Sequence, residues 1–159
     1  MLEQLFAPIS PVIVVLFLLA LAISSIGFRK TVWFISIGYV FSITAMIGAV
    51  VLIFREQLTL VTLLQNAVLL VWSLRLGFFV IRREGQTAYQ AQVAEQNARI
   101  NKLPIFVKAA IWISSSLLYV AMFSPSLFTL TAPAQPTGFA LVVAWIGIAI
   151  QVGGLLMEW

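Results

Sequence analysis

Residues 60–81 read LVTLLQNAVLLVWSLRLGFFVI, a stretch in which apolar side chains follow one another with few interruptions. A bilayer hydrocarbon core of about 30 Å is crossed by about 20 apolar residues in helical conformation. The apolar residues run continuously and do not alternate with polar ones, which favours a helix over a barrel strand. The stretch therefore predicts a transmembrane helix.

Four further stretches of the chain are also long and apolar, two before residues 60–81 and two after them. They cover residues 11–28, 31–54, 105–123 and 138–157. Hydrophobic residues make up 62% and charged residues 9% of the 159-residue chain, whereas soluble domains are about 25% charged. We therefore expect an all-α, polytopic integral membrane bundle of about five transmembrane helices, forming one domain over residues 1–159.

The distribution of basic residues predicts how the bundle is oriented. Basic residues gather in the connections after the first and third spans, where they are Arg29, Lys30, Arg82, Arg83, Arg99, Lys102 and, just inside the fourth span, Lys108. The opposite side carries only Arg55. Because cytoplasmic loops are enriched in Lys and Arg, we expect the N-terminus outside and the C-terminus in the cytoplasm. No basic residue precedes the first span, so we expect this span to be retained and not cleaved as a signal peptide.

Two of the connections have predicted structure of their own. Residues 82–104 are rich in Ala, Gln and Glu, which favours a short interfacial helix at 87–101. Residues 124–137 contain Pro125, Pro133 and Pro136, and this composition predicts an ordered external turn.

Polar groups inside a membrane span are costly, so they are candidates for function. In the third span, the helical repeat places Gln65, Trp72 and Arg83 on one stripe, with Arg75 and Arg82 on its flank. This ladder combines an amide, an indole and guanidinium groups. It suits an anionic ligand, because arginine forks match the geometry of phosphate oxygens.

The same polar residues also have structural interpretations. Arg82 and Arg83 suit ordinary positive-inside positions, and Trp72 and Gln65 suit packing and hydrogen bonding between helices. Arg75 fits a structural ion pair as well as a ligand contact. Glu158, at the end of the fifth span, suits either a solvated carboxylate or a partner of one of these arginines.

Composition excludes several classes of site. The chain has no Cys and no His, which excludes disulfides, Cys/His zinc sites and histidine base chemistry. We expect no metal site. The net charge of +4 and the pI near 10 do not indicate a nucleic-acid partner, because the basic residues sit at the ends of apolar segments. The expected surroundings are the lipid bilayer.

Residues 70–85 read LVWSLRLGFFVIRREG and resemble the W-x-x-R-L-x … R-x-x-G signature of a bacterial membrane family. That family is the DUF1295 group, which is related to the steroid 5-alpha-reductases. Residues 33–39 resemble the W-x-x-G-F/Y region of the preceding helix, and Pro125 falls where the family has a proline that ends the next helix. Residues 153–159 resemble the approach to the family's E-x-x-A-D-x-Q motif, so the resemblance extends to the end of the chain.

The resemblance implies a membrane reductase that passes hydride from NADPH to a carbon–carbon double bond of a steroid-like or other lipid enone. It implies Arg75, Arg82 and Arg83 as contacts of the cofactor. Gln65, Trp72 and Glu158 are candidates for residues that bind the substrate or line the site. Trp72 stands where the steroid reductases have a catalytic Tyr, so the catalytic residue is not identified.

The family continues past residue 159 with further helices that hold an R-x-x-R-H-P-N-Y segment and most of the cofactor-binding residues. We therefore expect the N-terminal portion of such an enzyme, in a bacterial inner membrane. One alternative is a non-catalytic membrane protein that packs with a partner chain. Another is a lipid methyltransferase of the isoprenylcysteine type.

Overall fold

The computed structural model describes residues 9–131 and 137–157, and all regular structure in these ranges is helical. Five helical segments are long and apolar enough to cross a membrane, which confirms the predicted number of spans. In chain order the elements are α2 (Ile9–Ser24), η1 (Ser25–Phe28), η2 (Thr31–Phe34), α3 (Ile37–Ile53), α4 (Leu60–Glu84), α5 (Thr87–Asn101), α6 (Ile105–Thr131) and α7 (Phe139–Met157).

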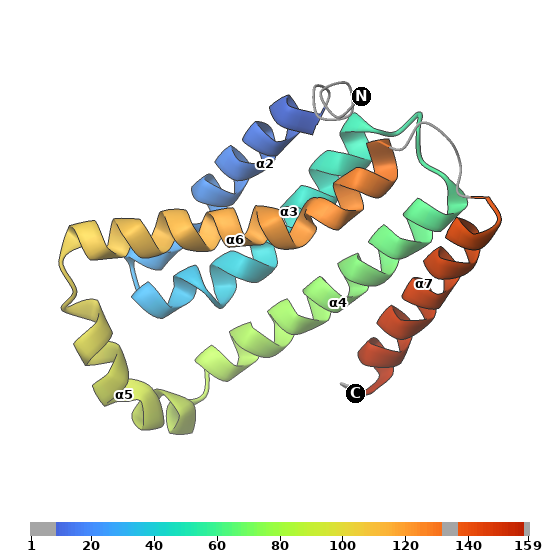
Figure 1. Cartoon of the computed structure of the whole chain (residues 1–159). Coiled ribbons are helices and arrows are strands. Elements are labelled where there is room, and N and C mark those ends of the chain that lie inside the picture. The colour runs from blue at the N-terminus through green and yellow to red at the C-terminus, as the bar shows by residue number, and fades with distance from the viewer. Residues whose placement is uncertain (1–8, 132–136, 158–159) are drawn as a thin grey trace.

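Successive spans run in opposite directions along the bundle (Figure 1). Helices α2, α3 and α6 pack together, α4 lies against α3, and α7 lies beside α4. The core is formed by apolar side chains of α2, α3 and α6, among them Leu16, Ala20, Met46, Val50, Phe123 and Leu127. Helix α5 crosses the end of the bundle where α4 ends and α6 begins, at the position predicted for the interfacial helix.

Polar side chains join α2 to α6 inside the bundle. The hydroxyls of Ser24 and Ser116 lie 2.9 Å apart, and both residues are fully buried. Nearby, the indole Nε1 of Trp112 donates to the main-chain oxygen of Leu21 at 3.0 Å. These contacts pair polar groups that hydrocarbon would leave unsatisfied, so they hold the two helices in one register.

Helices α3 and α4 approach closely because Gly77 has no side chain. A Cβ atom at Gly77 would lie 2.8 Å from Cγ1 of Val40. One turn away, the hydroxyls of Thr44 and Ser73 are 3.0 Å apart. Small residues at such a crossing let the two backbones come together, which is a common basis of helix packing in membranes.

The predicted turn at residues 124–137 is wrong over its first part, because α6 continues through Pro125 to Thr131. Proline removes one helical hydrogen bond and leaves the carbonyl four residues earlier without its donor. Here the hydroxyl of Ser124 donates to that carbonyl, at Ala121, over 2.8 Å. This replacement bond allows the helix to continue. Pro133 and Pro136 lie outside the described residues.

The boundaries of the first three spans also differ in detail from the sequence expectation. The α-helical part of the first span ends at Ser24, and the 3-10 turns η1 and η2 connect it to α3. The ring of Phe34 packs so closely on Gly27 that a Cβ atom there would overlap it. Helix α4 continues to Glu84, three residues beyond the expected end.

We predict that Gly77→Ala destabilises the bundle. The added methyl group would meet the stiff side chain of Val40, and such overpacking costs about 1–3 kcal/mol, more than the roughly 1 kcal/mol that alanine gains in helix propensity. Thermal unfolding in detergent, followed by circular dichroism, measures the change. Gly48→Ala in α3 is the matched control, because its Cβ would meet nothing within 4 Å. Equal unfolding midpoints for the two variants would contradict the close crossing.

Candidate functional site

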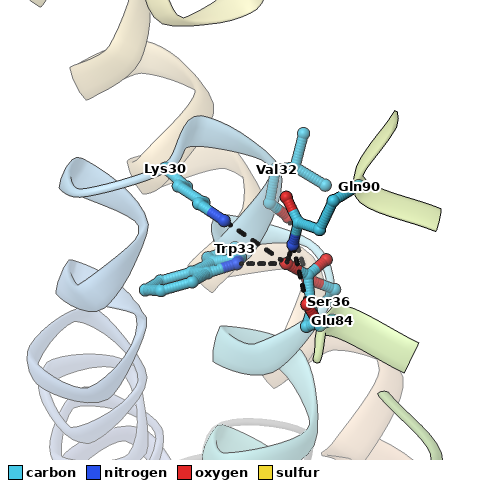
Figure 2. A network of polar contacts seen from close by, with 6 residues as sticks. All are labelled: Lys30, Val32, Trp33, Ser36, Glu84 and Gln90. Atoms are coloured by element: carbon cyan, nitrogen blue, oxygen red, sulfur yellow. Dashed lines mark hydrogen bonds and ion pairs between the residues drawn. The ribbon is translucent and has the colours of Figure 1, made fainter. Parts of the chain in front are cut away.

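The carboxylate of Glu84 joins three segments at the α5 end of the bundle (Figure 2). Its Oε2 accepts from Nε1 of Trp33 at 3.2 Å and lies 3.7 Å from Nζ of Lys30. Nε2 of Gln90 is 3.4 Å from the same oxygen and donates to the main-chain oxygen of Glu84 at 2.7 Å. The Glu84 side chain is only 12% exposed. This residue therefore connects η2, the end of α4 and helix α5.

Arg83 precedes Glu84 but has different neighbours. Its guanidinium carbon lies 4.7 Å from the ring centre of Tyr89 and 5.7 Å from that of Phe79. Its Nε is buried without a hydrogen-bond partner, and Arg83 forms no ion pair within the described residues. Aromatic faces stabilise this cation, and its donors are not occupied by a carboxylate. It is therefore a candidate for contact with an anion.

Two hollows lie on the outer side of Arg83 and the neighbouring arginines. The first, of about 540 Å³, lies between the end of α4 and the start of α5, and it is lined by Phe79, Arg82, Arg83, Gln86, Ala88, Tyr89 and Gln92. The second, of about 450 Å³, is lined by Arg75, Leu76, Phe78, Phe79 and Arg82. Arg82 lines both hollows, so one run of basic side chains borders them.

A larger hollow of about 610 Å³ lies on the inner side of Arg83. Its walls come from η2, α3, α4, the end of α5 and the start of α6, and they are mostly apolar. The polar exceptions are Thr31, Ser36, Tyr39 and Arg83. Arg83 therefore borders both a mostly apolar hollow among the helices and a hollow rich in hydrogen-bond donors.

A fourth hollow, of about 360 Å³, lies among α3, α4, α6 and α7. Trp72 and Tyr39 line it from α4 and α3, and Gln151 lines it from α7. The Gln151 Oε1 atom is buried and has no hydrogen-bond partner. This hollow is apolar except for these three side chains.

Tyr39 lines both interior hollows. Its ring packs edge-to-face on Trp72, with centroids 6.1 Å apart, and lies 5.2 Å from the ring of Tyr119. The Tyr119 hydroxyl in turn donates to the main-chain oxygen of Phe34. The three aromatic rings thus form a connected wall between the helices.

The structure divides the predicted polar ladder of α4 among these hollows. Arg83 borders the hollow of about 610 Å³, Trp72 lines the hollow beside α7, and Arg75 and Arg82 line the hollow of about 450 Å³. Gln65 is half-buried and is not part of the walls of these four hollows. Glu158 lies outside the described residues. Whether any of them contacts a ligand stays a prediction.

Several polar residues of these sites were not among the sequence predictions, and Glu84, Tyr39 and Gln151 are the main examples. Glu84 directly follows two arginines, so the local pattern indicates basic charge and gives no sign of a buried carboxylate. Gln151 could have been identified from the sequence, because it is an amide in the middle of an apolar span. Within the described ranges, no three acidic side chains gather as metal ligands would.

The fold and its hollows define a multi-pass helical membrane protein with basic side chains at the α5 end. The family model described as a protein of unknown function (DUF1295) matches residues 16–159, and the chain belongs to this family. This result confirms the predicted family, while the likeness to steroid 5-alpha-reductases stays a prediction. No curated protein and no solved structure matches the chain.

We predict that Glu84→Ala lowers stability and loosens α5. The variant loses the contacts with Trp33, Lys30 and the side chain of Gln90, and a hydrogen bond to a charged group contributes about 1.5–3 kcal/mol. Limited proteolysis within residues 85–104 and thermal unfolding measure the two effects.

The matched control for this prediction is Glu95→Ala in α5. Glu95 pairs with Arg99 at 2.6 Å, but its side chain is 80% exposed, so the pair should contribute only about 0.5 kcal/mol. Equal proteolysis rates for the two variants would contradict a role of Glu84 in holding α5.

Proposed function

We propose that the chain acts in a membrane-embedded, NADPH-dependent reduction of a carbon–carbon double bond in a steroid-like or other lipid enone. Membership in the DUF1295 family, whose signature residues 70–85 resemble, supports this function through the expected relation of that family to the steroid 5-alpha-reductases. The observation that carries it is Arg83, which borders both a donor-rich hollow and an apolar one. Such an enzyme needs an anionic cofactor and a lipid substrate side by side.

The residues of the outer hollow fit the phosphate groups of NADPH. Arg82 and Arg83 supply positive charge, and the side-chain amides of Gln86 and Gln92 supply neutral donors. The buried, unpaired Nε of Arg83 is an unused donor at this place. NADPH, when bound, supplies the hydride. Arg75, which borders the adjoining hollow, would extend the same positive surface.

The inner hollow fits the apolar body of an enone. Its volume of about 610 Å³ falls within the roughly 300–1,000 Å³ that small-molecule sites occupy. The hydroxyl of Tyr39 is a donor in this wall that can orient a carbonyl oxygen, whereas the Ser36 hydroxyl already donates to the main-chain oxygen of Val32 at 3.2 Å. Trp72 lies in the neighbouring hollow against the Tyr39 ring, so Trp72 would support Tyr39 without contacting this substrate.

We propose a cytoplasmic position for the α5 end of the bundle, in the inner membrane of a bacterium. The described basic residues Lys30, Arg82, Arg83 and Arg99 lie at or near this end, and Arg55 lies at the other. Positive charge on one side favours the cytoplasm. A cofactor hollow bordered by Arg82 and Arg83 would then open toward the cellular pool of NADPH.

A second candidate is a non-catalytic membrane protein that acts with a partner chain. Helix α7 favours it, because α7 packs mainly on α4 and leaves most of its apolar side chains exposed, Ile150 at 70% and Leu156 at 66%. Lipid can also cover such a surface. Cofactor binding distinguishes the two candidates, since the second requires none.

We predict saturable binding of NADPH to the purified chain in detergent, with NADH bound more weakly. Quenching of tryptophan fluorescence is the readout. Arg83→Gln should weaken NADPH binding about tenfold, equivalent to about 1.4 kcal/mol, because it removes a charge-assisted donor. Arg75→Leu should weaken binding in the same direction.

The control for these variants is Arg99→Gln. Arg99 is 79% exposed and pairs with Glu95 on the outside of α5, so its loss should leave NADPH affinity unchanged. Circular dichroism establishes that each variant is folded. Unchanged affinity in folded Arg83→Gln would exclude the proposed cofactor hollow, and no binding to the folded wild-type chain would favour the second candidate.

A further inference from the structure

We infer that the hollow of about 360 Å³ among α3, α4, α6 and α7 is a separate binding site for an apolar alcohol from the bilayer. The ligand class is a long-chain or polycyclic molecule with one free hydroxyl group. The inference does not rest on the proposed reductase activity, because it concerns a different hollow with different polar groups.

The walls of this hollow select a neutral, apolar ligand. None of its lining residues is charged, and most are aliphatic or aromatic, namely Ile43, Val68, Leu69, Met122, Phe123 and Leu155. Met122 on α6 and Gly154 on α7 are exposed at its edge. In a membrane, lipid-soluble molecules reach this edge directly, whereas an anion would find no cationic side chain in the lining.

Gln151 gives the site its specificity. The amide lies in an apolar helix, its Oε1 is buried, and no donor within the described residues reaches it. A buried polar atom without a partner is unfavourable, and hydrocarbon offers few waters to satisfy it. A ligand hydroxyl supplies the missing donor. A hydroxyl also accepts, so it can pair with the amide in either orientation of its oxygen and nitrogen.

The size of the hollow argues against a protein segment as its occupant. A helix with its side chains is about 10–12 Å across and rises 5.4 Å per turn, so one turn fills roughly 400 Å³ or more. The hollow of about 360 Å³ is smaller than that, but it falls within the roughly 300–1,000 Å³ of small-molecule sites. The packed rings of Tyr39 and Trp72 form one wall of this hollow.

Photolabelling of the full chain in lipid nanodiscs tests the site. The probe is a long-chain primary alcohol with a diazirine on its alkyl chain, and peptide mass spectrometry locates the label. We expect saturable labelling of α4 near Trp72 and of α7 near Gln151. Unlabelled alcohol should compete about ten times better than its methyl ether or the matching alkane, because neither of these can donate a hydrogen bond.

Two variants separate recognition of the hydroxyl from filling of the hollow. Gln151→Leu should abolish the preference for alcohol over ether and should unfold at a temperature no lower than wild type, since it removes an unpaired polar group. Gly154→Leu should block labelling at the site by occupying it. Gly153→Leu is its control, because both glycines have open space at Cβ but Gly153 does not line the hollow.

Three results would overturn the inference. The first is equal competition by alcohol, ether and alkane, which would mean that the hollow holds ordinary lipid chains. The second is non-saturable labelling spread over all lipid-facing helices. The third is occupation of the site by a second copy of the chain. This would be seen as a loss of labelling when the α7 helices of two copies are cross-linked. Unaltered alcohol preference in folded Gln151→Leu would exclude the role of Gln151.

Discussion

Hydrocarbon offers no hydrogen bonds, and the need to pair polar groups decides which helices of this chain hold together. The hydroxyl pair of Ser24 and Ser116 joins α2 to α6. The pair of Thr44 and Ser73 joins α3 to α4, at the crossing that Gly77 makes close. Helix α7 packs mainly on α4, and most of its side chains are apolar.

This difference in polar pairing determines where the hollows lie between the helices. Where paired hydroxyls and the apolar core bring α2, α3 and α6 together, side chains fill the space. The interior hollows open where α4 diverges from that core, one toward α5 and one toward α7. The Glu84 carboxylate contacts η2 and α5, which both contribute residues to the first of these hollows. The hollows thus lie where polar pairing between the helices stops.

The sequence predicted the elements of the fold well because they depend on local properties. Apolar runs of membrane length defined the five spans, and helix-favouring residues at 87–101 defined α5. The end of α6 was mispredicted because proline usually ends a helix. The bond from Ser124 to Ala121 depends on a side-chain rotamer that composition does not specify.

The candidate sites were less predictable because they depend on contacts between distant segments. On the surface of α4, Arg83 and Arg75 border different hollows, and Arg82 borders a hollow with each of them. The contact of Trp33 with Glu84 joins residues 51 positions apart, and nothing local to either residue indicates it. Tyr39 was missed for the same reason, since its place between two hollows exists only after α3 packs against α4.

Arg83 and Gln151 are polar residues at the hollows, and they differ in charge, so each would suit a different class of ligand. Arg83 keeps a positive charge between aromatic rings at the end of the bundle, where water and anions have access. Gln151 keeps a neutral amide oxygen inside the span, where only a lipid-soluble donor arrives. The two groups therefore differ in what they could offer a ligand, because a cation suits an anion and a neutral amide oxygen suits a neutral hydrogen-bond donor.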